Sequence, residues 1–179
     1  VKALKSHGGV KFRDLDTPNE SAVEKGAANL THLIGVVRSY GLPVVVAINE
    51  FPTDTDGETA IVKRQADDAG AFAAVQSRVF AEGGAGGVEL AEAVIDAAKD
   101  GPRDVTYLFP EDAPVEDKVK ALATHIYCAD DVAWAPAARR ALKRFHERGW
   151  GTLPVCMAKT HLSISHNPRL SGRPSGYTF

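Results

Sequence analysis

The chain has 179 residues, of which 44% are hydrophobic and 25% are charged, and its net charge is −2. This composition is typical of a folded domain and excludes a mostly disordered chain, while the charge balance argues against a broad nucleic-acid or membrane-surface contact. The longest aliphatic run, residues 44–48, is far shorter than the roughly 20 residues that span a bilayer.

Between residues 19 and 75 the patterns predict a helix, a strand, a second helix and a second strand. The first helix ends before Pro43 and carries apolar residues at helical spacing, namely Leu30, Leu33, Ile34 and Val37. Residues 44–48 are almost continuously β-branched, which is typical of a strand buried on both faces of a parallel sheet. Residues 58–69 are predicted to form the next helix, with Asp56 as its cap, and residues 71–75 the next strand.

The rest of the chain continues the alternation. Further helices are predicted at residues 88–99, after Pro114 and after Pro136, and further strands at residues 105–109 and 153–158. The pattern indicates an α/β fold, a mostly parallel sheet of βα units flanked by helices. Basic residues cluster on the last helix, where they predict a solvated face or, alternatively, a subunit contact: Arg139, Arg140, Lys143, Arg144 and Arg148.

Two loops that follow predicted strands carry unusual residues. In the first, Phe51 precedes Pro52, and because proline restricts both residues, the ring could be held stiffly and offered to a flat ligand. The alternative is that Phe51 packs into the core and the Asp/Thr run after it only caps the next helix. The second loop, residues 80–87, holds four glycines that could bring backbone N–H groups to an anion: Gly83, Gly84, Gly86 and Gly87.

The glycine-rich loop taken alone is also compatible with a flexible turn. It matches neither GxGxxG nor the phosphate loop GxxxxGK[ST], and the chain contains no Gly-Lys dipeptide. Lys159 and Arg173 could each meet a phosphate or carboxylate, or could form a structural salt bridge. The spacing of Cys156, His161 and His166 is not that of common zinc sites, so no metal centre is expected.

Two cysteines outside any paired motif, and no secretory leader pattern at the start, lead us to expect a reducing, cytoplasmic environment. The chain begins at Val1 and ends with a strand-like sequence at Phe179, so we expect an excised piece of a longer protein.

Several segments together resemble formate–tetrahydrofolate ligase (10-formyltetrahydrofolate synthetase). They occur in that family's order over essentially the whole chain and comprise residues 3–5, 7–9, 43–55, 81–91, 153–160 and 172–174. The resemblance implies the substrates ATP, formate and tetrahydrofolate, with Mg and a monovalent cation, and a reaction through formyl phosphate to 10-formyltetrahydrofolate. It also implies a homo-oligomer, a tetramer, with no nucleic-acid or membrane partner.

The resemblance implies that the chain is a C-terminal-half fragment of a larger P-loop-type ligase, lacking the phosphate loop and inactive alone. Residues 1–42 would end the nucleotide-binding domain and add a connecting helix, and residues 43–179 would form a truncated folate-binding domain. Two alternatives remain open. One is an inactive binding or assembly module derived from the ligase, and the other is a generic nucleotide-binding α/β domain.

The resemblance also implies roles for single residues, although it identifies no catalytic residue. Phe51 and Phe80 correspond to opposite walls of a pterin slot, with Phe80 where the family usually has tryptophan, and Pro52 and Thr53 line the same cleft. The glycines of residues 83–87, with Lys159 and Arg173, are implied for nucleotide or anion binding. Glu50 and Glu82 stand where basic residues are common, which should weaken attraction for an anionic substrate.

Overall fold

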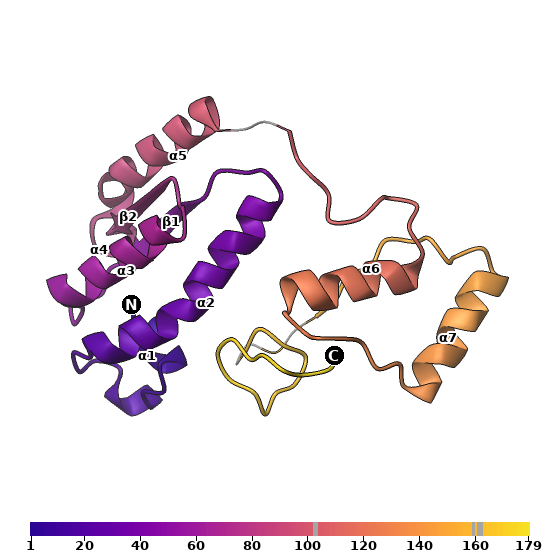
Figure 1. The fold of residues 1–179 in the computed structure, drawn as a ribbon. Coiled ribbons are helices and arrows are strands. Elements are labelled where there is room, and N and C mark those ends of the chain that lie inside the picture. The colour runs from indigo at the N-terminus through magenta and orange to yellow at the C-terminus, as the bar shows by residue number, and fades with distance from the viewer. Residues whose placement is uncertain (102–103, 159, 161–162) are drawn as a thin grey trace. The chain divides into compact units, whose positions relative to one another are not determined.

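The computed structural model describes residues 1–101, 104–158, 160 and 163–179 (Figure 1). The chain divides into two units, Val1–Thr106 and Tyr107–Phe179. The boundary predicted between residues 42 and 43 falls inside the first unit, in the connection between a helix and a strand.

The first unit is a mixed α/β structure. In Figure 1 the two strands lie between α5 on one side and α3 on the other. In chain order its elements are α1 (Lys2–His7), the 3-10 turn η1 (Phe12–Asp14), α2 (Glu20–Ser39), β1 (Val45–Asn49), α3 (Asp56–Asp68), β2 (Ala73–Ser77), α4 (Val79–Glu82), the 3-10 helix η2 (Gly83–Gly87) and α5 (Val88–Asp100). The α/β class and the parallel pairing predicted from the sequence are confirmed.

The two strands pair in parallel, with Val45 opposite Ala73 and Asn49 opposite Ser77. Each begins one or two residues later than predicted. Because the strands are parallel and end at matched positions, their carboxyl ends lie at the same edge of the sheet. The two unusual loops therefore start next to each other.

The core of this unit is formed where α2, α3 and β1 meet. Val23 of α2, Ile48 of β1, and Ile61 and Val62 of α3 are buried against one another. Of the face predicted for the first helix, Ile34 is buried and Leu30 packs against this cluster, but Leu33 and Val37 are exposed, so the predicted face is only partly correct.

Two helices of this unit, α2 and α3, begin at side-chain caps. Asn19 caps α2 by accepting a hydrogen bond from the Ala22 N–H at 2.9 Å. The cap of α3 is Thr55 and not Asp56. Thr55 has extended backbone, its hydroxyl accepts from the Glu58 N–H, and its own N–H donates to the Glu58 carboxylate. At the other end of α2, Gly41 has a φ of 77°, a conformation that favours glycine.

The second unit combines helices with long irregular segments. It contains α6 (Val115–Ala121), which continues as a π-helical turn η3 (Leu122–Ile126), and α7 (Pro136–Glu147). The predicted helices after Pro114 and Pro136 are therefore confirmed. The basic side chains of α7 are exposed, which both a solvated face and a subunit contact predict.

The strands predicted at residues 105–109 and 153–158 are wrong, since neither segment forms a strand. The Thr106 N–H donates to the Tyr40 carbonyl in the turn after α2, and not to a neighbouring strand. In the other segment the Leu153 and Met157 carbonyls accept from the side chains of Lys118 and Tyr127. An apolar run becomes a strand only where another strand supplies the matching hydrogen bonds.

Candidate functional site

The first loop is a closed and rigid turn. The Asp54 N–H donates to the Phe51 carbonyl at 2.9 Å, and the Phe51 N–H donates to Asp54 Oδ2 at 3.1 Å. The capping box at Thr55 then leads directly into α3. The alternative interpretation of this loop is therefore half correct. Thr55 does cap the next helix, but Phe51 is not packed into the core, because its side chain is 42% exposed.

Phe51 lines a pocket of about 240 Å³ beside β1. Val46 and Asn49 of the strand and Lys2 and Leu4 of α1 also contribute to its wall. Pro52 and Thr53 are exposed at the tip of the same loop. The pocket therefore combines an apolar wall, an aromatic ring and the Lys2 ammonium, a lining that suits a flat, polar-edged ligand.

Lys2 and Asp16 extend this site, and sequence reasoning missed both. The Lys2 ammonium lies 4.7 Å from the centroid of the Phe51 ring, within cation–π range. The same ammonium pairs with Asp16 Oδ1 at 2.5 Å, and that oxygen accepts the Thr53 hydroxyl at 3.2 Å. The hydrogen bond and charge of Lys2, followed by the hydrogen bond of Thr53, lower the pKa of Asp16.

Asp54 is a second group that local reasoning did not single out. Its Oδ2 holds the Phe51 N–H, while its Oδ1 is buried without a hydrogen-bond partner in the described parts of the chain. Burying an unpaired carboxylate oxygen is unfavourable. Asp54 therefore offers an acceptor next to Phe51 that a ligand N–H group could satisfy.

The second loop is folded and not an open turn. Phe80 lies in α4 with its side chain fully exposed, and residues 83–87 form the 3-10 helix that leads into α5. Gly83 has a φ of 61°, and a Cβ on Gly86 would stand only 2.5 Å from the Arg78 carbonyl carbon. Glycine is thus required at both positions by the backbone itself. Gly84 is exposed, and anion binding by these glycines stays a prediction.

The negative charge of Glu50 is paired. Its Oε2 accepts from Arg78 Nε and from Gln76 Nε2, both at 2.9 Å. The hydrogen bond and charge of Glu50 raise the pKa of Arg78 further above its usual value, and Glu82 contributes in the same direction. The repulsion that Glu50 alone would exert on an anionic ligand is therefore reduced by its partner.

The remaining predicted residues belong to the second unit or lie outside the description. Arg173 is exposed there, and its Nη2 lies 3.6 Å from the Cys128 sulfur as a donor. Lys159 and His161 lie outside the described residues. Within the described parts of the chain there is no grouping of three or more His, Cys, Asp or Glu side chains that could hold a metal ion.

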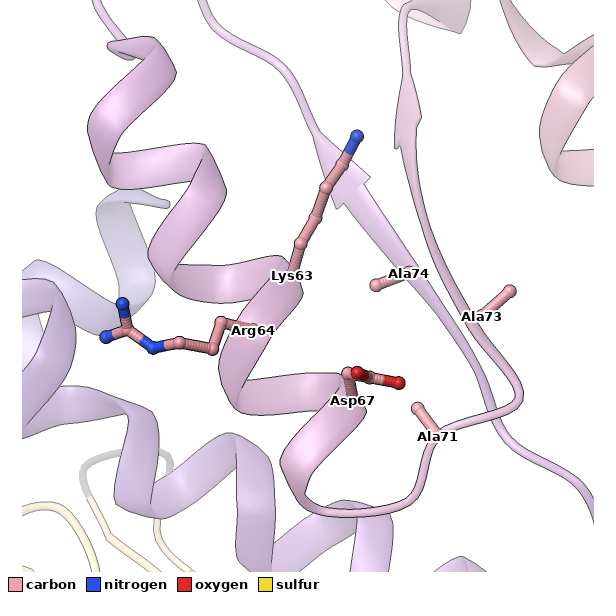
Figure 2. Close-up of a pocket in the computed structure, with 6 residues that line it drawn as sticks. All are labelled: Lys63, Arg64, Asp67, Ala71, Ala73 and Ala74. Atoms are coloured by element: carbon pink, nitrogen blue, oxygen red, sulfur yellow. The ribbon is translucent and has the colours of Figure 1, made fainter.

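In two other pockets the charged side chains described below are engaged with other groups of the protein. A cavity of about 290 Å³ lies between α3 and the approach to β2, where Figure 2 shows Arg64 pointing away from Ala73 and Ala74. Arg64 is engaged with Glu24 at 2.7 Å. A larger pocket of about 590 Å³ in the second unit is lined by Tyr107 and Phe109, and the Lys118 ammonium beside it is occupied by backbone carbonyls.

A parallel βαβ unit, with an exposed aromatic ring and a glycine-rich turn at the carboxyl ends of its strands, defines an α/β protein whose loops lie where ligands commonly bind in this class. The family model of formate–tetrahydrofolate ligase matches residues 1–179, and the chain belongs to that family. Among the helices of the described residues, none is long and apolar enough to cross a membrane.

Curated relatives agree with this family. The formate–tetrahydrofolate ligases of Roseiflexus sp. (strain RS-1) and Desulforamulus reducens are 49% and 46% identical to this chain, each alignment covering 100% of the chain and 33% of the relative. The cytoplasmic C-1-tetrahydrofolate synthase of Saccharomyces cerevisiae is 44% identical, over 100% of the chain and 20% of its own length. The chain thus spans about a third of the length of the bacterial relatives.

Proposed function

We propose that this chain forms the folate platform of an ATP-dependent ligase that joins formate to tetrahydrofolate. The reaction phosphorylates formate to formyl phosphate, and N10 of the folate then attacks the activated carbonyl to give 10-formyltetrahydrofolate and phosphate. Family membership supports the reaction. The observation that supports the platform is the partly exposed Phe51 ring, held by a closed turn after β1, a strand that is not buried on both faces as predicted, since only its Ile48 is buried.

In this proposal the pterin stacks on Phe51 and Phe80, with Pro52 and Thr53 along its edge. Stacking of a flat heterocycle on an aromatic side chain contributes about 1–3 kcal/mol per ring, by analogy with nucleic-acid bases. Lys2 covers one face of Phe51, so the pterin uses the other face or displaces the ammonium. Asp54 Oδ1 supplies an acceptor for an N–H group of the pterin.

In this proposal Gly83, Gly84, Gly86 and Gly87 contribute to binding of the nucleotide or an anion, and the same kind of role is proposed separately for Lys159 and Arg173. The catalytic power required is mostly alignment of two anions with a weak nucleophile, which fixed N–H groups and cations provide. ATP and tetrahydrofolate are substrates in this proposal. Mg and a monovalent cation are expected from the family, and no residue of this chain is named here as their ligand.

The biological setting is proposed from the same family. The named cytoplasmic relative in yeast supports a cytoplasmic location, and the resemblance supports a homo-oligomer. The 179 residues contain no phosphate-loop motif, so we expect them to bind folate without ligase activity when isolated.

The test is tetrahydrofolate binding to the intact protein, measured by calorimetry. Phe51→Ala should weaken binding at least about fivefold, the loss of one stacking face. Phe12→Ala is the matched control, because Phe12 is 91% exposed in the same unit but outside the pocket. Unchanged affinity in Phe51→Ala would show that the pterin does not stack on this ring.

A further inference from the structure

We propose that Arg78 is a positioning residue that holds the Phe51 loop and the Phe80 turn in one arrangement for folate. The inference rests on the proposed folate site. It concerns how two separate segments of the chain, each bearing one aromatic ring, are held in fixed positions relative to each other.

The side chain of Arg78 ties down the first loop. Its Nε donates to Glu50 Oε2 at 2.9 Å, and Gln76 donates to the same oxygen. The Glu50 N–H in turn donates to the Ser77 carbonyl at 3.1 Å. Glu50, which directly precedes Phe51, is therefore held by both its backbone and its carboxylate against the end of β2.

The backbone of Arg78 organises the second segment. Its N–H donates to the Gly86 carbonyl at 3.0 Å, and its carbonyl accepts from the Ala81 and Glu82 N–H groups at 3.0 and 2.9 Å. Gly86 lies so close to the Arg78 backbone that no side chain fits between them. The turn that carries Phe80 is thus closed on Arg78 from both directions.

One residue consequently contacts both segments, through its side chain on one side and its backbone on the other. A slot for a rigid ring system binds best when its walls are already placed, because ordering them on binding costs free energy. The ion pair is half exposed, with side-chain exposures of 52% for Arg78 and 32% for Glu50. Its effect therefore arises from the placement of the loops and not from a strong isolated bond.

Charge reversal separates this role from simple attraction of an anionic substrate. Glu50→Lys adds positive charge at the site, so attraction alone predicts tighter tetrahydrofolate binding. Loss of the Arg78 contact predicts weaker binding, by about threefold to tenfold for a broken pair with like charges opposed. The Arg78→Glu variant should weaken binding similarly, because Glu50, Glu82 and Glu89 then face a further carboxylate.

The double variant Glu50→Lys/Arg78→Glu should restore the affinity to within about twofold of wild type, since the pair re-forms with opposite polarity. Gln76 can serve either partner, because its amide both donates and accepts. Arg64→Glu is the matched control, since it reverses an equally exposed arginine whose partner, Glu24, lies outside the site. Thermal unfolding of each variant would show whether a loss of affinity reflects loss of the fold.

The binding titrations use the intact protein and tetrahydrofolate. Tighter binding by Glu50→Lys, or a double variant no better than the single ones, would overturn the positioning role of Arg78. Phe51→Ala in the same series keeps the two proposals apart. If Phe51→Ala weakens binding and the reversals do not, the folate site stands and the role of Arg78 fails, whereas unchanged binding in Phe51→Ala removes the site itself.

Discussion

The Lys5 ammonium lies 3.0 Å from the Glu58 carboxylate, and both side chains are completely buried. Lys5 also donates to the Thr17 carbonyl at 3.2 Å, and Glu58 accepts from the Asn19 and Thr55 N–H groups. The pair therefore joins α1, the start of α2 and the start of α3 directly behind the Phe51 loop. Its satisfied hydrogen bonds make burial of two charges tolerable.

Removing one member of this pair should strongly destabilise the fold. Lys5→Met leaves the Glu58 carboxylate buried without its counter-charge, and the free energy of unfolding should fall by about 3–5 kcal/mol. Urea denaturation of the intact protein measures this, with exposed Lys11→Met as the control. A loss below about 1 kcal/mol, the value for an ordinary surface pair, would contradict a structural role for the buried pair.

The pair should also make the stability of the fold fall at low pH. Burial alone would raise the pKa of Glu58, but hydrogen bonds from the Asn19 N–H, Lys5 and the Thr55 N–H outweigh it and lower the pKa below the ordinary value of 4.5. A carboxyl with a lowered folded pKa contributes stability that is present above the unfolded value and is lost as the pH falls through the folded one.

Urea unfolding measured from pH 7 downward should therefore show a decline in stability that begins near pH 4.5 and continues below it. Glu58→Gln should reduce the slope of this decline while lowering stability at neutral pH. An unchanged slope in Glu58→Gln would assign the acid sensitivity to other carboxyl groups.

In the second unit, Lys118 has a comparable structural role. Its side chain is 2% exposed, and its ammonium donates to the carbonyls of Glu111, Thr152 and Leu153 at 2.5, 2.7 and 3.4 Å. Lys118→Met would leave these carbonyls without their hydrogen-bond donor, and we expect a loss of about 3 kcal/mol in unfolding free energy.

Lys120→Met on the same helix is the control for Lys118→Met. Lys120 is 65% exposed and lies 3.9 Å from Asp131, so its loss should cost about 0.5 kcal/mol or less. Similar thermal midpoints for the two variants would argue against the importance of the buried ammonium.

The exposed Phe80 ring should accept enlargement. Because the side chain is fully exposed, Phe80→Trp adds stacking surface without crowding the core, and tetrahydrofolate should bind about twofold to fivefold more tightly. Phe12→Trp, at another exposed ring of the same unit, should leave affinity unchanged. Equal or weaker binding by Phe80→Trp would remove Phe80 from the proposed slot.

Local patterns in the sequence were sufficient for most elements of the fold. The helices at residues 20–39 and 88–100 follow from apolar periodicity, because the residues that define a helical face lie within a few positions of one another. The failures at residues 105–109 and 153–158 have the opposite cause. Whether an apolar run becomes a strand depends on a partner that is distant in the chain.

The same division applies to the candidate site. The sequence by itself determined that an aromatic–proline pair and a glycine-rich turn follow two strands, because those signals are contiguous. Only the tertiary structure decided that Lys2 covers Phe51 and that Arg78 pairs with Glu50. These contacts join residues 28 or more positions apart, and a charged side chain can reach many partners until the packing of helices on the sheet selects one.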